Sequence, residues 1–503
     1  MTEIGSTIRF LLKWSGLVIG GLVLVALLLF TVAWTVNLRD EPLTPESQAL
    51  RVPPPNPYAP EDNIYLALAG LDAPPGESVT VVGLARIERF NRQVDLASRA
   101  ARPETLGGAA TQDPGPRLEF RGDVGFCEPL NRSVWRDAPA HRTDIAKLLA
   151  DNAELYQRYV GLHRRRGFHE TAQPSITAPP VYFPAMPIRK LFLADAALRL
   201  RTGEPRAQRA ALADLTDDVR LWRAVLTGRG ALISKMIAIA YLEGDYLLLA
   251  DMIADPQAPV PLGAADADGV VPLFAPGDWN IGSVFAEEFR AEVATLEQLQ
   301  RASATGLRVP ERYTGDLLLQ SWNRAENIAG AHFFKLHATE NQFARQAARL
   351  IGSAAADPAA FTANGRQPLG SPPVSEHPWT VWLSYNPIGQ ILAAIPAQGL
   401  TGYAPRAWDG AALQRLVRLS YEIRRQGIEP AGIPAFLARH PEWSTHPGDG
   451  RPFLWDAKNG ELRVQTMGRQ PAGRRFGIRI WQIGLAACWS RRHRPLAPPA
   501  APR

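Results

Sequence analysis

A polar stretch in the second half of the chain carries the residue types that acid–base chemistry needs. It spans Ser321–Ala344, and its candidate catalytic residues are Glu326, His332, His337 and Glu340. A carboxylic acid or a histidine held against a bound substrate can transfer a proton in the transition state. The competing interpretation is structural, because asparagine and histidine side chains at a helix junction hydrogen-bond to the backbone. If the chain has an active site, we expect it in this stretch.

Other catalytic and cofactor signatures are absent from the sequence. There is no G-x-S-x-G, S-x-x-K, H-E-x-x-H, Walker A, G-x-G-x-x-G or C-x-x-C motif. The nine histidines do not predict a metal site either, because no two of them have the i, i+4 spacing that presents two ligands on one face of a helix. We therefore expect no cofactor and no bound metal.

The charge pattern argues against a nucleic-acid partner. The net charge of +6 is modest for 503 residues, and the 49 acidic residues are interspersed among the basic ones. Only six of the 55 basic residues are lysine, and coding bias in a GC-rich genome explains the arginine excess more economically than phosphate binding does. The two cysteines, Cys127 and Cys488, could pair in an oxidising compartment, but the sequence alone leaves their pairing open.

One segment near the N-terminus is apolar enough to cross a membrane. No charged residue lies between Lys13 and Arg39, and residues 14–38 make a helix of roughly 37 Å at 1.5 Å per residue. The hydrocarbon core of a bilayer is about 30 Å thick, so this helix spans it with some tilt. A cleaved signal peptide fits less well, because its apolar region is only about 7–15 residues long and bulky Trp34 follows the small residues here.

We infer the orientation of this span from the short N-terminal tail and the long domain after the span, more than from the flanking charges. Arg9 and Lys13 precede the span, and Arg39 and Arg51 follow it. The number of basic residues on each side therefore hardly distinguishes the two possible orientations. The short tail, residues 1–13, is typical of an uncleaved signal anchor, and long domains are translocated largely regardless of charge. We therefore expect a bacterial inner-membrane protein with a cytoplasmic N-terminus and a periplasmic bulk.

The chain beyond the span begins with a spacer and a helical domain. Residues 39–61 are rich in proline, which predicts a semi-rigid, extended spacer. Residues 62–404 show helical periodicity in most segments, including an apolar stripe around Trp222. Residues 231–255 are apolar on nearly every side, which predicts the most buried helix of the set. The predicted fold class is mainly α, with an α-helical bundle behind the transmembrane helix.

The period of the pattern changes in residues 405–489, which predict a helix followed by a small antiparallel β-hairpin or meander. Asn459-Gly460 is a strong signal for a type I′ turn, because both turn positions need a positive φ. The alternating strand that follows has one apolar face, which should pack on the helix at 410–426. We expect Asp409 to cap that helix and Gly427 to close it. The final segment, 490–503, is basic and rich in proline, and we expect it to be disordered.

This C-terminal part carries the one family resemblance in the sequence. The run LVRLSYEIRRQGIEPAGIPAFLARHPEWSTHPGDGRPFLWDAKNGELRV, residues 416–464, resembles a tail of uncharacterised membrane-anchored bacterial proteins. It is more distantly similar to the helix-then-hairpin end of pseudopilin-like proteins. The resemblance covers about 50 residues and carries no catalytic residue. In pseudopilins the membrane helix runs straight into the domain, whereas hundreds of residues intervene here, so the resemblance does not extend to pilus assembly.

Two function classes follow from these observations. The first is a single-span, membrane-anchored, non-enzymatic scaffold or interaction protein of the envelope, which contacts the lipid bilayer through residues 14–38 and binds an unknown protein partner. The alternative is an extracytoplasmic hydrolase with its site around residues 321–344. A deep cleft that holds a carboxylate and a histidine within hydrogen-bond reach would favour the hydrolase. A helical bundle without such a cleft would favour the interaction protein.

Overall fold

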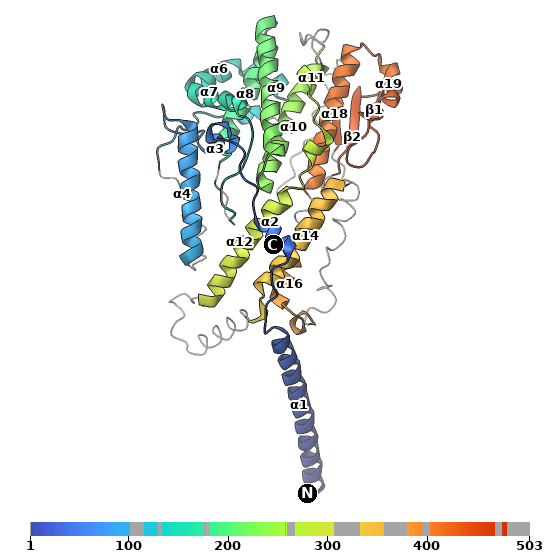
Figure 1. The fold of residues 1–503 in the computed structure, drawn as a ribbon. Coiled ribbons are helices and arrows are strands. Elements are labelled where there is room, and N and C mark those ends of the chain that lie inside the picture. The colour runs from blue at the N-terminus through green and yellow to red at the C-terminus, as the bar shows by residue number, and fades with distance from the viewer. Residues whose placement is uncertain are drawn as a thin grey trace.

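The computed structural model describes residues 2–100, 115–128, 133–175, 179, 181–256, 258, 267–305, 332–356, 380–394, 403–467 and 475–479. Figure 1 shows a long N-terminal helix that projects from a body of packed helices, with a small sheet at the edge of that body. The prediction of a mainly α fold with an N-terminal apolar helix and a small antiparallel sheet is confirmed. The C-terminal tail and Cys488 lie outside the described residues, so the disorder of the tail stays a prediction and the pairing of Cys127 with Cys488 stays open.

The projecting helix is α1 (Thr2–Val36). Its segment Trp14–Val36 is the one described helix that is long and apolar enough to cross a membrane, and only 6% of its most apolar stretch is buried. A soluble core helix of this composition would be covered on most sides. The predicted span therefore has the length, composition and exposure of a single-pass anchor.

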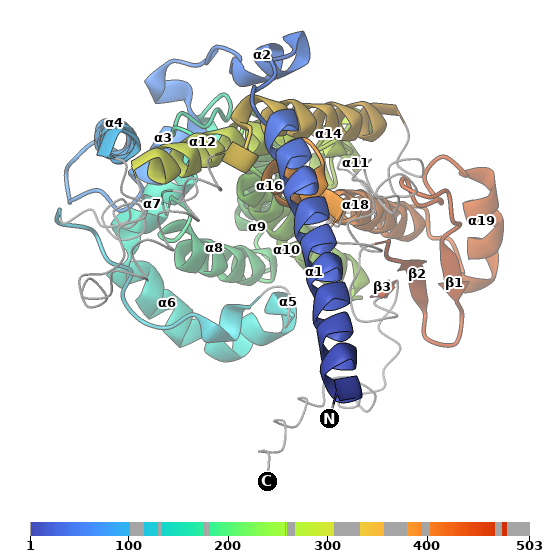
Figure 2. The same cartoon turned by 90° about the horizontal axis from the view of Figure 1, so that it is seen from below.

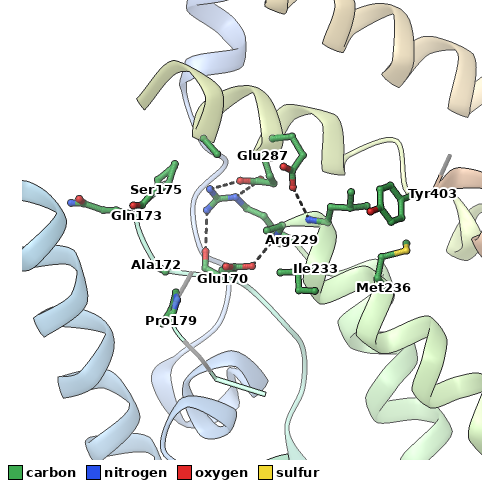
Figure 3. Close-up of a pocket in the computed structure, with 15 residues that line it drawn as sticks. Glu170, Ala172, Gln173, Ser175, Pro179, Arg229, Ile233, Met236, Glu287 and Tyr403 are labelled. Atoms are coloured by element: carbon green, nitrogen blue, oxygen red, sulfur yellow. Dashed lines mark hydrogen bonds and ion pairs between the residues drawn. The ribbon is translucent and has the colours of Figure 1, made fainter. Parts of the chain in front are cut away.

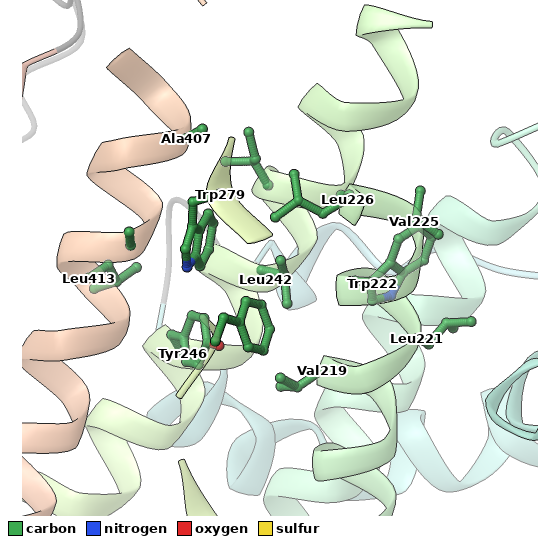
Figure 4. Packing of buried hydrophobic residues seen from close by; sticks show 14 of the residues in the cluster. Val219, Leu221, Trp222, Val225, Leu226, Leu242, Tyr246, Trp279, Ala407 and Leu413 are labelled. Carbon is green, nitrogen blue, oxygen red and sulfur yellow. The ribbon is translucent and has the colours of Figure 1, made fainter. Parts of the chain in front are cut away.

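The centre of the body is a layer of long helices around α10 (Leu232–Ala254). This helix packs between α9 (Pro205–Thr227) and α18 (Ala404–Arg425), and α8 (Ala185–Leu200) covers α9 from outside. Figure 4 shows the apolar side chains of these helices meeting in the core. Trp222 is fully buried, and α10 has more buried residues than α8 or α9. Helix α18 has more still, 18 against 15 in α10, so the prediction that residues 231–255 form the most buried helix is wrong.

A second group of helices covers one side of this layer. It consists of α3 (Ile64–Ala69), α4 (Val79–Ala100), α5 (Val134–Asp137), α6 (Arg142–Asp151) and α7 (Ala153–Gly161). Asn63 caps α3, because its Oδ1 accepts the Tyr65 N–H at 3.0 Å. The close approach of α3 and α4 requires Gly83, since a Cβ at that position would lie 1.9 Å from the Leu66 carbonyl oxygen.

The end of the body nearest α1 is built from four elements that come together from distant parts of the sequence. They are α2 (Pro45–Arg51), α12 (Val284–Thr305), α14 (Leu336–Ala356) and α16 (Pro387–Ala394). Helix α2 packs against both α12 and α14. Figure 2 shows these elements near the end of α1 that meets the body. Two further short α-helices in the described part of the chain are α11 (Ala267–Val270) and α19 (Ile433–Arg439).

Helix α2 differs from the extended spacer that the proline content predicts for residues 39–61. Pro45 occupies the first turn of the helix, where a missing N–H costs nothing. Thr44 caps the helix by accepting the Ser47 N–H at 3.2 Å. Proline therefore starts a helix here instead of extending the chain, and the segment binds to the body.

The sheet consists of β1 (Leu454–Asp456), β2 (Glu461–Gln465) and β3 (Arg475–Arg479). The strands are antiparallel and lie in the order β1-β2-β3, so the predicted meander is confirmed. Leu462 and Val464 are buried, and β2 packs on α18, as the alternating pattern predicts. The buried apolar cluster runs without a break from α3 to β3, so the core is continuous across residue 405.

The prediction of a type I′ turn at Asn459-Gly460 is wrong. Asp456 pairs with Glu461, which leaves a four-residue loop, and only Gly460 has a positive φ, at +64°. The Asp456 carboxylate accepts hydrogen bonds from the Asn459 N–H at 3.2 Å and from its Nδ2 at 2.7 Å. This local side-chain turn holds Asn459 at a negative φ and leaves the left-handed position to glycine.

Helix α18 also begins earlier than Asp409, the residue that the sequence suggests as its cap. Its first residue is Ala404, and Asp409 lies inside the helix, where it accepts the Met467 N–H at 2.7 Å. The last residue of the helix is Arg425, and Gly427 closes it as predicted, with a φ of +62°. The Ile428 N–H bonds to the Ile423 carbonyl at 3.0 Å, which completes a Schellman motif.

Candidate functional site

The described members of the candidate set at 321–344 bind the chain that emerges from α1. His332 donates from Nε2 to the Trp34 carbonyl at 2.9 Å, and its ring stacks on the Trp34 indole with centroids 3.6 Å apart. His337 donates from Nδ1 to the Glu41 carbonyl at 3.1 Å. Glu340 is fully buried and forms an ion pair with Arg51. Glu326 lies outside the described residues.

Asparagine side chains complete this contact between α1 and the body. Asn37 is fully buried, and its Nδ2 donates to the carbonyls of Ala33 at 2.8 Å and Ser384 at 3.0 Å. Its Oδ1 accepts the Asn386 N–H at 2.7 Å. Asn386 has a φ of +54°, an unusual value for a residue other than glycine. The end of α1 is thus bonded to the body through the His332 contact with the Trp34 carbonyl and through the side chain of Asn37.

We call this set of contacts the anchor joint, and define it as residues 33–51 together with 332–341 and 384–386. Asn341 belongs to it, since its Oδ1 accepts the Ser47 hydroxyl at 2.7 Å and its Nδ2 donates to the Pro42 carbonyl at 3.0 Å. The three catalytic candidates that the structure describes, His332, His337 and Glu340, are therefore brought together, but around a helix end and a backbone segment. This is the arrangement of a structural joint.

A pocket lies elsewhere, beside the first turn of α10. Figure 3 shows it between α10, α12 and the segment that follows Glu170. Its volume is about 340 Å³. One wall is apolar and the other carries charge, a combination that is common in ligand sites. The apolar wall includes Leu232, Ile233, Met236 and Tyr403, and the charged wall consists of Glu170, Arg229, Glu287 and Glu288.

Two carboxylates of the charged wall cap α10. The N-cap residue of this helix is Ala231, whose side chain cannot accept a hydrogen bond. Glu170 Oε2 instead accepts the Ala231 N–H at 2.9 Å and the Ser234 hydroxyl at 3.1 Å, and Glu288 Oε1 accepts the Leu232 N–H at 2.8 Å. Negative charge is favourable at a helix N-terminus, so both groups stabilise α10.

The arginine of the pocket is held by several partners. Arg229 donates from Nε and Nη2 to the two carboxylate oxygens of Glu287, at 2.7 and 3.0 Å, and from Nη1 to Nε2 of His169 at 2.9 Å. Glu287 also binds Arg290, whose Nη1 donates to the Leu50 carbonyl at 2.6 Å. A chain of hydrogen bonds thus connects the pocket wall to α2 and the anchor joint.

The pKa values of the acidic side chains in this region are shifted in different directions. Burial raises the pKa of Glu170 and Glu288, although hydrogen bonds from α10 oppose this effect. Burial and the neighbouring Glu288 raise the pKa of Glu292, one turn further along α12, to about 8. Burial acts in the same direction on Glu287, but the hydrogen bonds from its two arginines outweigh it and lower the pKa. Glu170 and Glu288 therefore hold a proton more readily than an exposed glutamate does.

A second charged cluster lies in the core and lines no part of this pocket. Arg189 forms ion pairs with Asp218 and Asp245, and all three side chains are buried. Tyr159 donates to Asp218 at 2.7 Å and accepts the Trp222 indole N–H at 3.1 Å. Burial raises the pKa of Asp245, while hydrogen bonds and Arg189 lower that of Asp218. This network joins helices, and buried groups of this kind are costly to leave unpaired.

Sequence reasoning missed the pocket residues because they come from four separate segments without a motif. One signal was available. Glu287 and Glu288 occupy adjacent positions near the start of a helix whose Phe285 and Phe289 are buried, so one of the two acidic residues had to lie close to the core.

Comparisons with models of protein families, with characterised proteins and with solved structures found no match to this chain.

Proposed function

We propose that this chain is a single-pass protein of the bacterial inner membrane that holds a non-enzymatic interaction domain on the periplasmic side. The observation that carries the proposal is the anchor joint. A flexible tether would make no fixed contact with the domain, whereas here His332 binds the Trp34 carbonyl at the end of α1 and Asn37 binds the Ser384 carbonyl of the body. Such a joint sets the direction in which the domain faces, which is the requirement of a scaffold and not of a freely tethered enzyme.

The pocket is the place where we expect a partner to bind. The hydrogen bonds of Glu170 and Glu288 to α10 use one oxygen of each carboxylate, so a second oxygen of each can accept a donor from a ligand. Ile233 is 52% exposed at the apolar wall. A protein segment with an amide or basic donor beside an apolar side chain fits both walls.

Photo-crosslinking in native membranes tests this proposal. A photoreactive amino acid in place of Ile233 should give a discrete adduct with one envelope protein. The same amino acid in place of Leu454, which is 63% exposed on β1, serves as the matched control and should give none. No adduct at Ile233, or the same adducts at both positions, would contradict the proposal.

A reporter fusion tests the orientation separately. Alkaline phosphatase fused after residue 60 should be active, because that enzyme needs the oxidising periplasm to form its disulfides. A cytoplasmic reporter fused at the same place should be silent. The reverse pattern would overturn the orientation, and a mature N-terminus near residue 34 would show that the span is cleaved.

One observation keeps a hydrolase as the second candidate. Carboxyl groups with a raised pKa beside a cavity, such as Glu170 and Glu288, are suited to general acid catalysis. A hydrolase of this kind would use the pocket instead of residues 321–344. Activity of the full chain on ester, peptide or glycoside substrates, lost in both Glu170→Gln and Glu288→Gln, would establish it.

A further inference from the structure

The base of the body carries an exposed tryptophan beside the end of the anchor. The 3₁₀ turn η8 (Thr380–Leu383) packs against α1, and Val381 within it is buried. Trp382 in the same turn is 48% exposed. An exposed indole on a soluble surface loses the benefit of burying a large apolar ring, so its position next to a membrane helix is informative.

A line of aromatic rings connects Trp382 to the anchor. The Trp34 and Phe333 rings meet edge to face with centroids 6.2 Å apart, and the Phe333 and Trp382 rings do the same at 6.5 Å. Phe333 is buried between the two indoles, with 8% of its surface exposed. Trp382 therefore lies two ring contacts away from the last turn of α1.

The length of the span places this line of rings at the membrane surface. The apolar segment Trp14–Val36 has 23 residues and is roughly 35 Å long at 1.5 Å per residue. It therefore exceeds the hydrocarbon core of about 30 Å by a few ångströms, and Trp34 falls in the interfacial layer. Tryptophan is enriched in this layer, where its ring meets lipid and its N–H meets carbonyl and phosphate groups.

We infer that Trp382 inserts into the headgroup layer of the phospholipid bilayer, so that the domain rests on the membrane by a second contact beside α1. The inference rests on the proposed function in one respect, that α1 spans the membrane. The partner is the lipid interface, because the exposed Trp382 ring lies beside the end of the span and is linked to Trp34 through the buried ring of Phe333. Arg39, which is exposed directly after α1, adds a cation at the same level for lipid phosphates.

The anchor joint keeps η8 in this position. Ser384, which directly follows the turn, accepts Asn37 Nδ2 through its backbone carbonyl, and the Asn386 N–H donates to Asn37 Oδ1. The Asn386 side chain in turn donates to Thr339 Oγ1 at 2.9 Å on α14. The turn is thus bound both to the end of the anchor and to the body, and it cannot swing away from the bilayer alone.

Site-directed spin labelling of the full chain in phospholipid nanodiscs tests the inference. Cys127 and Cys488 are replaced by serine, and a nitroxide is attached in turn to Leu24→Cys in the span, to Trp382→Cys and to Leu454→Cys on β1. Accessibility to oxygen reports lipid contact, and accessibility to a water-soluble nickel chelate reports exposure to water. We expect nickel accessibility at 382 to be about fivefold lower than at 454, with 24 the most protected.

The three labels separate failure of the inference from failure of the anchor. Nickel accessibility at 382 equal to that at 454, with 24 still protected, would overturn the second contact and leave the anchor intact. An aqueous environment at 24 would overturn both. If Trp382→Cys lowers the helical circular dichroism of the chain, a label at Leu383→Cys in the same turn replaces it and must show the same protection.

Discussion

The anchor joint and the pocket are built from the same residue types, yet their polar groups are used differently. In the joint, Asn37, His332, Glu340 and Asn341 each bind the end of α1 or the segment that follows it. In the pocket, Glu170 and Glu288 cap a helix and still border a cavity. Polar residues that cluster in a sequence can therefore serve to hydrogen-bond backbone groups. Here it is the adjoining cavity that distinguishes a candidate ligand-binding site from a structural contact such as the anchor joint.

Removal of the cation at the joint should have the largest effect on stability. Arg51→Met leaves Glu340 as a fully buried carboxylate without its ion pair, and we expect the free energy of unfolding to fall by about 3 kcal/mol. Urea unfolding of the full chain, followed by circular dichroism, measures it. Arg345→Met on α14, the helix that carries Glu340, is the control. Arg345 is exposed, so its loss should change the free energy of unfolding only a little. Equal effects of the two variants would mean that Glu340 is not buried in the joint.

The matching change at the pocket should cost less. Arg229→Met removes one partner of Glu287, but Arg290 still binds that carboxylate. We expect a loss of about 1–2 kcal/mol in the same unfolding assay, because the remaining arginine keeps the charge paired. A loss as large as that of Arg51→Met would show that the pocket wall is as tightly integrated as the joint, and the distinction between the two regions would fall.

The smallest effect is expected from Glu292→Gln, and it depends on pH. Burial and Glu288 raise the pKa of Glu292 from 4.5 to about 8. The folded protein therefore binds this proton more tightly than the unfolded chain, and ionisation destabilises the fold as the pH rises through this window. The variant should be more stable than the wild type at pH 8, by about 1 kcal/mol because the side chain is only half-buried.

This difference should disappear below pH 4.5, where the carboxyl group is protonated in both states. Glu287 should behave in the opposite way, because its pKa is lowered. Its stabilising contribution is present at neutral pH and is lost as the pH falls through its folded pKa. A stability difference for Glu292→Gln that grows towards acid would contradict the assignment of Glu292.

Periodicity and short motifs in the sequence predicted which helices and strands exist better than they predicted where these elements end and what they contact. The apolar stretch of α1, the stripe around Trp222 and the alternation in β2 each follow from periodicity alone, and the structure contains all three. The turn at Asn459 and the start of α18 near Asp409 were mispredicted, because side-chain hydrogen bonds to Asp456 and Met467 decided them. The first of these bonds is local, but the Asn-Gly turn signal outweighed it in the prediction, whereas the second joins residues 58 positions apart.

The candidate site shows the same limit more strongly. The polar residues at 332–341 could be recognised as unusual, but their partners at 33–51 lie about 300 residues away in the sequence. The pocket brings Glu170, Arg229 and Glu288 together from segments separated by about 60 residues each. Long-range contacts of this kind are set by how helices pack, and neither spacing nor composition encodes them in a readable form.

The distance between the anchor and the body tests the central claim, that the anchor joint fixes α1 to the domain. Nitroxide labels at Leu28→Cys on α1 and Arg345→Cys on α14, in the full chain with Cys127 and Cys488 replaced by serine, report it by double electron–electron resonance in nanodiscs. We predict one narrow distance distribution that broadens in His332→Ala combined with Asn37→Ala. A broad distribution in the chain with an intact joint would contradict the claim, because the domain would then move freely on its anchor.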